Sequence, residues 1–356
     1  MSETQVVTFD VNGGNPRWLG AIGHVSQLVY SSSYPGGCDQ MSCVLQQPPD
    51  FRSDCMDPGR IVQCYRGAQR IFDGKLDEPQ PSASGWAITA HGSGVAGTDF
   101  LAVYGSYTPN DVITNGIGRG LRWATPSIST TGLYLAQPAA SGSQTITDFM
   151  NAVTALGGFA WQVARIDNSV TVEPLPSTPT RILVATTPVA RTIVADINAI
   201  GVQYTASDDS AGNQTFGQVW ATNAASIAKH GRMEAFADLS SAGVMTSAEA
   251  ITLGNLLLAK YQRANYAGPF TCLPGQILNP GGQPVDLGME QAGEVYRLVV
   301  TDGSYGGEVT PGPVTFIGGQ VEYDDGSGAL TVTPFASITS DLGSLVGALV
   351  AAITPR

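Results

Sequence analysis

The chain has three histidines, His24, His91 and His230, which stand far apart in the sequence. Histidine is the side chain best suited to act as a general base or a zinc ligand near neutral pH. None of the three stands in an H-E-x-x-H, G-x-S-x-G or H-x-E…C-x-x-C pattern. Whether these three histidines meet in space depends on the fold, but isolated histidines are more often ordinary strand or loop residues. We therefore predict no catalytic histidine.

Paired carboxylates are the second set of catalytic candidates, because two acids at a defined separation can divide acid and base roles. The pairs here, Asp77-Glu78, Asp208-Asp209 and Asp324-Asp325, are immediate neighbours. Neighbouring side chains in a strand point to opposite faces, and in a loop both are hydrated. The turn at Asp324 also lacks the further oxygen ligands of an EF-hand calcium loop. We predict neither a catalytic acid pair nor a metal site.

Four of the five cysteines, Cys38, Cys43, Cys55 and Cys64, lie close together in the sequence. Their spacing does not form the paired C-x-x-C knuckles typical of structural zinc. A disulfide is the next alternative, although a cytosolic assembly keeps its thiols reduced. We interpret Cys43 and Cys64 as small core residues of strands and Cys272 as a lone strand thiol.

The glycines Gly92, Gly94 and Gly97 match the G-x-G-x-x-G pattern of dinucleotide-binding loops. That function requires a helix to begin in the loop, because the helix N-terminus holds the pyrophosphate. The strand-like run from Thr98 to Gly105 follows instead. We predict a turn between strands and no bound cofactor.

The overall composition favours β-rich modules with many turns and few surface charges. The 356 residues include 43 Gly and 22 Pro, and only 13% are charged, with a net charge of −12. The 17 basic residues are scattered, so the chain lacks the Lys/Arg cluster that grips nucleic-acid phosphates. No basic segment followed by an apolar core opens the chain, and no secretory signal or membrane span is predicted.

The segment from Gly59 to Gly92 predicts a β-meander that would hold the first half of the chain together. Ile61–Cys64 is expected to be a strand, and Arg66–Ala68 a tight turn. Arg70–Leu76 is expected to form the strand that runs back after the turn, with a bulge or kink at Gly74. Trp86–His91 alternates apolar and polar residues and predicts a third strand.

The middle of the chain predicts a small α+β unit. Asp111–Ile117 is expected to be a short helix, and Thr145–Asp148 has the spacing of a capping box at the start of a second one. The segments Trp161–Ala164 and Ser169–Glu173 are expected to form a hairpin. A Pro/Thr/Ser-rich linker is predicted at 177–182.

The second half predicts another β group, preceded by a helix. Val202–Thr205 alternates as a strand, and 218–228 predicts a strand or a strand and turn. Thr246–Glu249 is a capping box that starts a helix. The strands expected after this helix are Pro269–Leu273, Val295–Val300, Thr315–Ile317, Gln320–Tyr323 and Leu330–Thr333.

The end of the chain predicts an apolar helix seam. Leu342, Val346, Leu349 and Ile353 follow one another at spacings of four, three and four, with no charge between Leu342 and Ile353. The segment is shorter than the ~20 residues of a membrane helix. Two alternatives remain open, docking on its own domain or an interface with other chains, and self-docking is slightly preferred.

The order of these segments resembles a known family. The run Tyr34–Cys38, the strand Met41–Leu45, Gly59–Val62 and then Ile71–Leu76 is similar to the first barrel of tail hub proteins, the minor tail or baseplate hub proteins of long-tailed bacteriophages. The resemblance implies a mainly β fold with two β-barrel tube-type domains, a small helix-plus-hairpin domain and a C-terminal helix.

The corresponding domain division has five parts. It assigns 1–105 to a first β-barrel hub domain, 106–180 to an inserted α+β domain, 181–236 to strands completing or extending the barrels, 237–336 to a second β-barrel led by a helix, and 337–356 to the C-terminal helix.

The resemblance also implies a function, that of a structural ring and not an enzyme. It implies a homotrimer whose six barrels surround a channel through which phage DNA passes without specific binding. It would sit in the virion tail tip, assembled in the host cytoplasm, next to the distal tail ring protein, the tape measure protein and tip or fibre proteins. The alternatives are a hexameric distal tail ring protein and a carbohydrate-binding or hydrolytic tail protein that attacks the host envelope.

Overall fold

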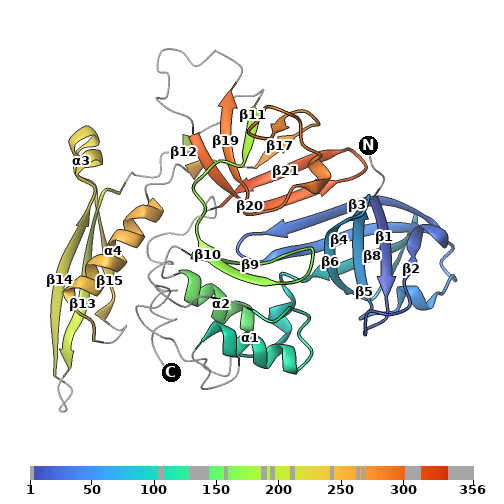
Figure 1. Cartoon of the computed structure of the whole chain (residues 1–356), viewed down its shortest axis with the longest axis horizontal. Coiled ribbons are helices and arrows are strands. Elements are labelled where there is room, and N and C mark those ends of the chain that lie inside the picture. Colours follow the sequence, from blue (N-terminus) through green and yellow to red (C-terminus); the bar gives the residue numbers. More distant parts are fainter. Residues whose placement is uncertain are drawn as a thin grey trace.

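The computed structural model of the chain is mainly β, as predicted (Figure 1). It describes residues 4–102, 108–126, 128, 144–155, 159–185, 191–192, 197–208, 213–240, 244–261, 265–266, 269–300 and 314–335. The predicted interface residues Leu342, Val346, Leu349 and Ile353 lie outside these ranges, so their role stays a prediction.

The first β group contains the predicted meander. β5 and β6 pair antiparallel around the turn at Gly67, and β6 then pairs with β8. A bulge or kink was expected at Gly74, but the register shift between β5 and β6 lies between Cys64 and Tyr65. A β-carbon at Gly74 would lie 2.4 Å from the carbonyl oxygen of His91, so this glycine permits β6 to approach β8. The strands are β1 (Thr4–Phe9), β2 (Arg17–Trp18), β3 (His24–Ser33), β4 (Gly37–Gln46), β5 (Ile61–Arg66), β6 (Gln69–Leu76), β7 (Gln80–Ser82) and β8 (Gly85–Gly92).

The second β group confirms the strands expected near the end of the chain. The two segments expected at 315–317 and 320–323 are one long strand, with a register shift between Gly318 and Gln320. The predicted linker ends in β11, which pairs parallel with β19. The strands are β11 (Arg181–Ala185), β17 (Phe270–Cys272), β18 (Ile277–Leu278), β19 (Val295–Val300), β20 (Val314–Asp324) and β21 (Ala329–Pro334).

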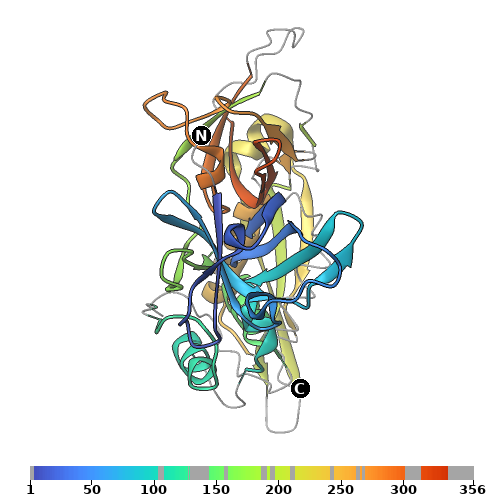
Figure 2. The ribbon, with the colours of Figure 1, turned by 90° about the vertical axis from the view of Figure 1, so that its right-hand side faces the viewer.

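The two β groups are joined edge to edge through β3 and β20. These strands pair antiparallel from Ser33 opposite Gln320 to Val29 opposite Asp324. The result is one 14-stranded sheet whose main strand order runs from β18 to β2. Among the described strands no pairing closes a barrel, so the two expected β-barrel tube-type domains are not confirmed. One hydrophobic cluster contains buried residues of both groups, and Figure 2 shows the second group above the first.

The α+β unit has the predicted elements, α1 (Pro109–Gly118), α2 (Ile146–Ala155), β9 (Phe159–Val163) and β10 (Val170–Pro174). The capping box of α2 is confirmed, because the Asp148 amide donates to Thr145 Oγ1 at 3.1 Å and the Thr145 hydroxyl donates to Asp148. The strand expected after Gly97 is wrong within the described part, where a 3₁₀ turn, η3 (Ala96–Asp99), is followed by an isolated bridge at Leu101.

A third unit contains β13 (Ala199–Asp208), β14 (Gln214–Thr222), α3 (Ala224–His230), β15 (Glu234–Asp238) and α4 (Ser247–Tyr261). The strand order is β14-β13-β15, and α4 packs on β13 and β14. The helix therefore covers its own small sheet and not the strands that follow it. The sequence did not predict α3, although Asn223 caps it by accepting from the Ser226 amide at 3.1 Å. A separate pair, β12 (Arg191–Thr192) and β16 (Asn265–Tyr266), completes the described strands.

Short 3₁₀ turns complete the chain, η1 (Leu19–Ala21), η2 (Asp54–Met56) and η5 (Leu287–Met289). Among the described residues there are three separate hydrophobic clusters: one in the two β groups, one in the α+β unit and one between α4 and its sheet. The five-part domain division made from the sequence stays a prediction.

Candidate functional site

The three histidines lie on different elements. His24 begins β3, His91 lies in β8 and His230 ends α3. His24 is opposite Gln46 of β4 and His91 is opposite Gln40 of the same strand, a separation of about 20 Å along that strand. His91 Nε2 lies 3.3 Å from Asp77 Oδ2 at an exposed position. The structure does not bring His24 and His91 together.

Of the predicted acidic pairs, Asp324-Asp325 serves a turn and an ion pair, and Asp209 lies outside the described residues. Asp324 accepts from the Ser327 hydroxyl at 2.7 Å and from the Gly326 amide at 2.9 Å, and these hydrogen bonds lower the pKa of the Asp324 carboxyl. Asp325 instead pairs with Arg66. Within the described ranges no group of three His, Cys, Asp or Glu side chains is placed to hold a metal ion.

The cysteines are all free and buried. Cys43 and Cys64 belong to the core of the β groups, as predicted. Burial raises the pKa of the Cys38 thiol to about 11, and of Cys43 and Cys272 to about 12. A thiol with so high a pKa is almost entirely protonated at neutral pH and is a poor nucleophile.

The glycines of the G-x-G-x-x-G pattern allow two backbones to approach closely. A β-carbon at Gly92 would lie 2.2 Å from the carbonyl oxygen of Cys38, and one at Gly94 would lie 2.6 Å from the amide nitrogen of Gly37. The Gly94 amide donates to the carbonyl of Cys38 at 2.8 Å. The pattern therefore packs the end of β8 against the start of β4. A turn is present as predicted, but the 3₁₀ turn η3 follows it and not a strand.

What the tertiary structure does assemble is a set of ion pairs and hydrogen bonds around mostly buried charged side chains where the units meet, which we call the joint. It is centred on Arg66, Asp73, Arg165 and Glu290. At Arg66 of β5, the guanidinium donates to Asp286 at 2.7 Å and to Asp325 at 2.9 Å, and its side chain is 3% exposed. These contacts connect the first β group to the loop before η5 and to the β20–β21 turn.

Asp73 of β6 connects the first β group to the α+β unit. The carboxylate is fully buried and accepts from Gln63 Nε2 at 2.7 Å and from Asn168 Nδ2 at 3.0 Å. Arg122 lies 3.2 Å away and Arg70 lies 3.4 Å away. Two cations and two amide donors thus balance one carboxylate, as a buried charge requires.

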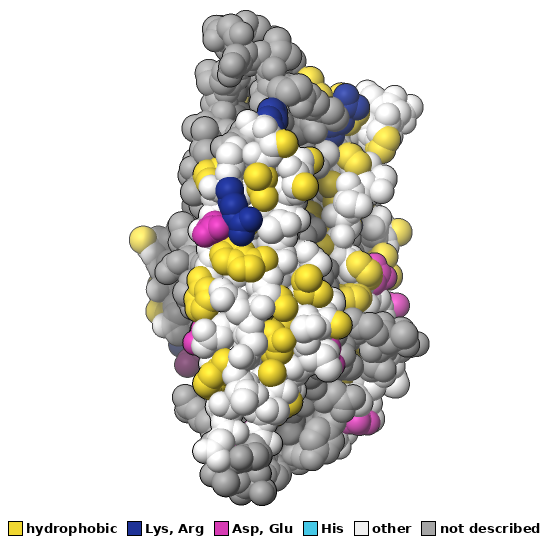
Figure 3. All heavy atoms as spheres, turned by 90° about the vertical axis from the view of Figure 1, so that its left-hand side faces the viewer, with side chains coloured by type: hydrophobic (Ala, Val, Ile, Leu, Met, Phe, Trp, Pro, Cys, Tyr) yellow, Lys and Arg dark blue, Asp and Glu magenta, His cyan; other side chains and the backbone are white. Residues whose placement is uncertain are grey.

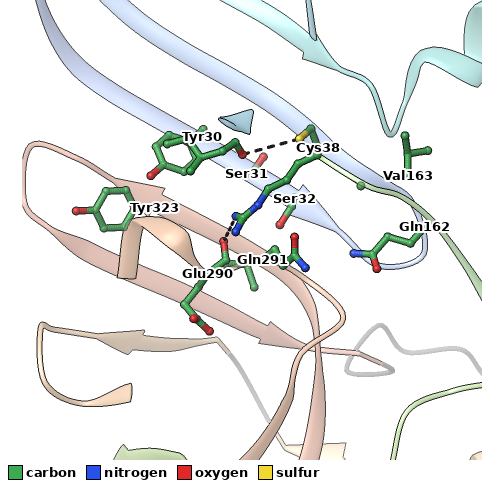
Figure 4. A pocket seen from close by; sticks show the side chains of 13 residues that line it. Tyr30, Ser31, Ser32, Cys38, Gln162, Val163, Glu290, Gln291 and Tyr323 are labelled. Atoms are coloured by element: carbon green, nitrogen blue, oxygen red, sulfur yellow. Dashed lines mark hydrogen bonds between the residues drawn. The ribbon is translucent and has the colours of Figure 1, made fainter. Parts of the chain in front are cut away.

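The β9–β10 hairpin contacts both β groups, and Figure 4 shows its residues Gln162 and Val163 beside the pocket. Arg165 donates to the carbonyl of Met289 at 2.7 Å, and Gln162 donates to the carbonyl of Ala292 at 3.0 Å. On the other side of the hairpin, the Val163 amide donates to the carbonyl of Gly36 at 2.6 Å. The hairpin is therefore hydrogen-bonded to both β groups at once.

A pocket lies at this meeting point, lined by residues that include Ser32, Cys38, Gln162, Glu290 and Tyr323 (Figure 4). Its volume is about 10 Å³, which leaves room for no more than a water molecule. This pocket is too small for a substrate, whereas a second and more open pocket of about 620 Å³ lies beside Arg66, Arg70 and Met289.

Glu290 is the buried carboxylate of the second β group. Arg181 Nε lies 2.9 Å from both carboxylate oxygens, and the Tyr296 hydroxyl donates to Oε2 at 3.3 Å. Burial raises the pKa of Glu290, and the charge of Arg181 opposes that rise. The pair anchors β11 to the loop before β19.

The sequence did not reveal the joint, because its partners lie far apart in the chain. Arg66 and Asp325 are separated by 259 residues, and Arg122 and Asp73 by 49. One signal was present at Asp73, a carboxylate in the apolar strand sequence Ile71-Phe72-Asp73. A charge at such a position needs a buried partner.

No protein-family model and no curated protein matches this chain. Solved structures do share its fold. Prophage tail protein gp18 of Listeria monocytogenes superimposes with a TM-score of 0.62 at 12% identity, covering 98% of this chain and 99% of that one. The 43 kDa tail protein of prophage MuSo2 from Shewanella oneidensis gives 0.59 at 10% identity, with 97% and 98% covered. A tail protein from Neisseria meningitidis gives 0.56 at 11% identity, with 96% and 98% covered.

The likeness therefore extends over nearly the whole length of each chain, and at these identities it concerns the fold. No helix in the described part of the chain has the length and hydrophobicity of a membrane span.

Proposed function

We propose that this chain is a structural protein of a phage tail tip, a hub that forms a homotrimeric ring between the tail tube and the tip and lets DNA pass. The shared fold with three prophage tail proteins over nearly their whole length supports this proposal. The site described above supports it as well, because its ion pairs and hydrogen bonds join separate units of the chain.

The observation that carries the proposal is the edge-to-edge pairing of the two β groups through β3 and β20. Each group is built on an antiparallel hairpin, β3–β4 in the first and β20–β21 in the second. Two similar units side by side in one chain become six in a trimer. Such a ring can match a sixfold tail tube on one face and a threefold tip on the other.

A ring around a channel also needs the two groups to keep a fixed angle. Arg66 crosses from the first group to the second, and the β9–β10 hairpin is bonded to both. In a close-packed interior such contacts resist small displacements. We assign the joint this holding role.

The charge distribution suits a channel through which DNA moves. The net charge is −12, and Arg66, Arg122 and Arg181 are each paired with carboxylates. Paired guanidinium groups are poorly available to phosphates. The proposed neighbours are the distal tail ring protein, the tape measure protein and tip or fibre proteins.

Native mass spectrometry of the purified chain over a range of concentrations tests the proposal, together with electron microscopy of the particles. We expect trimers with a central opening. A chain that stays monomeric at high concentration and with its neighbours contradicts the ring. A hexamer contradicts the hub and favours the distal tail ring alternative, and turnover of cell-wall glycan favours the enzymatic one.

A further inference from the structure

The third unit is an insertion in the second β group. The chain leaves this group after β11, passes through β12, forms β13, β14, α3, β15 and α4, and returns through β16 to β17. We call the described residues of this insertion, within 197–261, the arm. Figure 1 shows the arm to one side of the β groups, at the left of the view, with β12 between them.

The arm has a hydrophobic core of its own. This cluster includes Ile200 and Val202 of β13 and Leu253 and Leu257 of α4, and all of its described members belong to the arm. The main cluster, by contrast, contains residues of both β groups. Apolar burial is the main stabilising term in folding, so a core built within one unit stabilises that unit by itself.

The buried polar groups at the entrance of the arm are satisfied inside it. Asn198 is fully buried just before β13. Its side-chain amide donates to the carbonyl of Gly231 at 2.6 Å, and its side-chain oxygen accepts from the Met233 amide at 2.7 Å. The Asn223 amide donates to its backbone carbonyl at 2.9 Å. A buried amide is costly unless it is hydrogen-bonded, and these partners all lie within the arm.

The two segments that connect the arm to the rest of the chain are paired with each other. β12 and β16 are antiparallel, with Arg191 opposite Tyr266 and Thr192 opposite Asn265. We call this pair the neck. It is a separate two-stranded sheet and not part of the 14-stranded one. A two-stranded ribbon is only marginally stable by itself, so it bends more easily than a wide sheet.

The α+β unit is attached in a different way. Its residues Asn168, Gln162 and Arg165 all donate hydrogen bonds to the β groups. Among the arm's described residues the one ion pair, Arg232 with Glu234, lies within the arm. Units of one chain move relative to each other unless a large apolar interface holds them. The contacts therefore divide the chain into the arm and a body, which consists of the two β groups and the α+β unit.

We propose that the arm is a separately folded, rigid unit that pivots on the neck, while the body moves as one piece. A few residues at the ends of elements can absorb such a rotation. The pivot moves the surface seen in Figure 3, where hydrophobic side chains are spread among uncharged ones with few charged groups. The pivot needs only a single chain, so it is independent of the ring.

Spin labels on the intact chain measure the pivot. Ile251→Cys places one label on α4, where Ile251 is 40% exposed, and Lys75→Cys places the other on an exposed position of β6 in the body. The five native cysteines are buried, so they react slowly with the label. We expect the distribution of distances between the labels to be roughly twice as wide as within one rigid unit, or wider. Double electron–electron resonance measures it, with labelled chains mixed into an excess of unlabelled wild type.

Two label pairs inside single units are the matched controls. Lys75→Cys with Glu322→Cys spans both β groups, and Ile251→Cys with Gln218→Cys spans α4 and β14. Glu322 and Gln218 are exposed as well. Both control pairs should give narrow distributions. A distribution between Ile251 and Lys75 that is as narrow as the controls overturns the pivot, even if the arm folds separately.

Two identical substitutions test whether the arm folds separately. Ile200→Val removes one methylene group from the core of the arm, and Ile88→Val removes one from the core of the body, where both side chains are fully buried. We expect Ile200→Val to speed amide hydrogen exchange in β13 and α4 by roughly two- to tenfold and to leave β4 and β8 unchanged. Ile88→Val should do the reverse. Equal acceleration in both parts overturns the proposal, because it shows that arm and body unfold together.

Discussion

Asp73 shows at the scale of a single residue how this chain keeps a charge inside. Its carboxylate is balanced by Arg70, Arg122, Gln63 and Asn168. Replacing it by asparagine, Asp73→Asn, leaves two cations without their counter-charge. We expect the free energy of unfolding to fall by about 3 kcal/mol, in the range found when one partner of a buried pair is removed. Urea unfolding followed by tryptophan fluorescence measures this loss.

Asp77→Asn is the control for this substitution. Asp77 lies at the surface, with a 35% exposed side chain next to His91. Exposed pairs contribute about 0–1 kcal/mol, so this variant should unfold nearly as the wild type does. Equal losses for the two variants would show that burial of Asp73 has no special energetic role.

At the scale of elements, the start of α4 depends on its capping box. The Glu249 amide donates to Thr246 Oγ1 at 3.3 Å, and the Thr246 amide donates to Glu249 at 2.7 Å. Thr246→Ala should lower the stability of this unit by about 1 kcal/mol, the usual cost of losing a cap. Thr252→Ala, in the middle of the same helix, is the control. It should lower the stability by less, because the Thr252 hydroxyl only donates to the Ala248 carbonyl one turn earlier, at 2.7 Å. Amide hydrogen exchange along α4 distinguishes the two.

The same cap has a pH dependence with a defined sign. Hydrogen bonds from the Thr246 amide and hydroxyl lower the pKa of the Glu249 carboxyl from 4.5. The ionised form is therefore favoured in the folded state. Its contribution is complete above pH 4.5 and is lost as the pH falls through the lowered pKa.

Glu249→Gln has no such titration and checks that sign. The difference in stability between the wild type and this variant should shrink as the pH drops below 4.5. A difference that grows in acid would contradict the cap, and circular dichroism over a pH series measures it.

At the scale of the whole molecule, Arg66 connects the two β groups. Its guanidinium reaches Asp286 and Asp325 and lies 5.3 Å from the centre of the Tyr323 ring. Arg66→Met keeps the apolar stem and removes these bonds. We expect a loss of about 2 kcal/mol, because the two partially exposed carboxylates can turn to water. Calorimetry should show the unfolding of the two β groups further apart in temperature in this variant than in the wild type.

Arg52→Met is the control at this scale. Arg52 stacks 4.6 Å from the Trp86 ring and donates to the carbonyls of Pro49 and Phe51, all within the first β group. Its loss should leave the coupling between the groups intact. A wider separation in Arg52→Met and not in Arg66→Met would contradict the assigned role of Arg66.

The sequence by itself determined much of the local structure, because the signals are local. The meander strands β5 and β6, the hairpin β9–β10 and the capping boxes at Thr145 and Thr246 all lie where their patterns predict. Turn residues, alternation and caps act between residues a few positions apart. The mainly β fold follows from them.

Only the tertiary structure decided how these elements combine. The pairing of β3 with β20, the packing of α4 on its own sheet and the contacts of Arg66 join residues separated by long stretches of chain. The residue pattern of one strand does not specify which other strand its edge will pair with, because an edge strand offers the same backbone groups to any partner. The exposure of Trp18 and Trp220 was likewise set by the fold, because a tryptophan in an alternating strand is buried or exposed according to what covers its face.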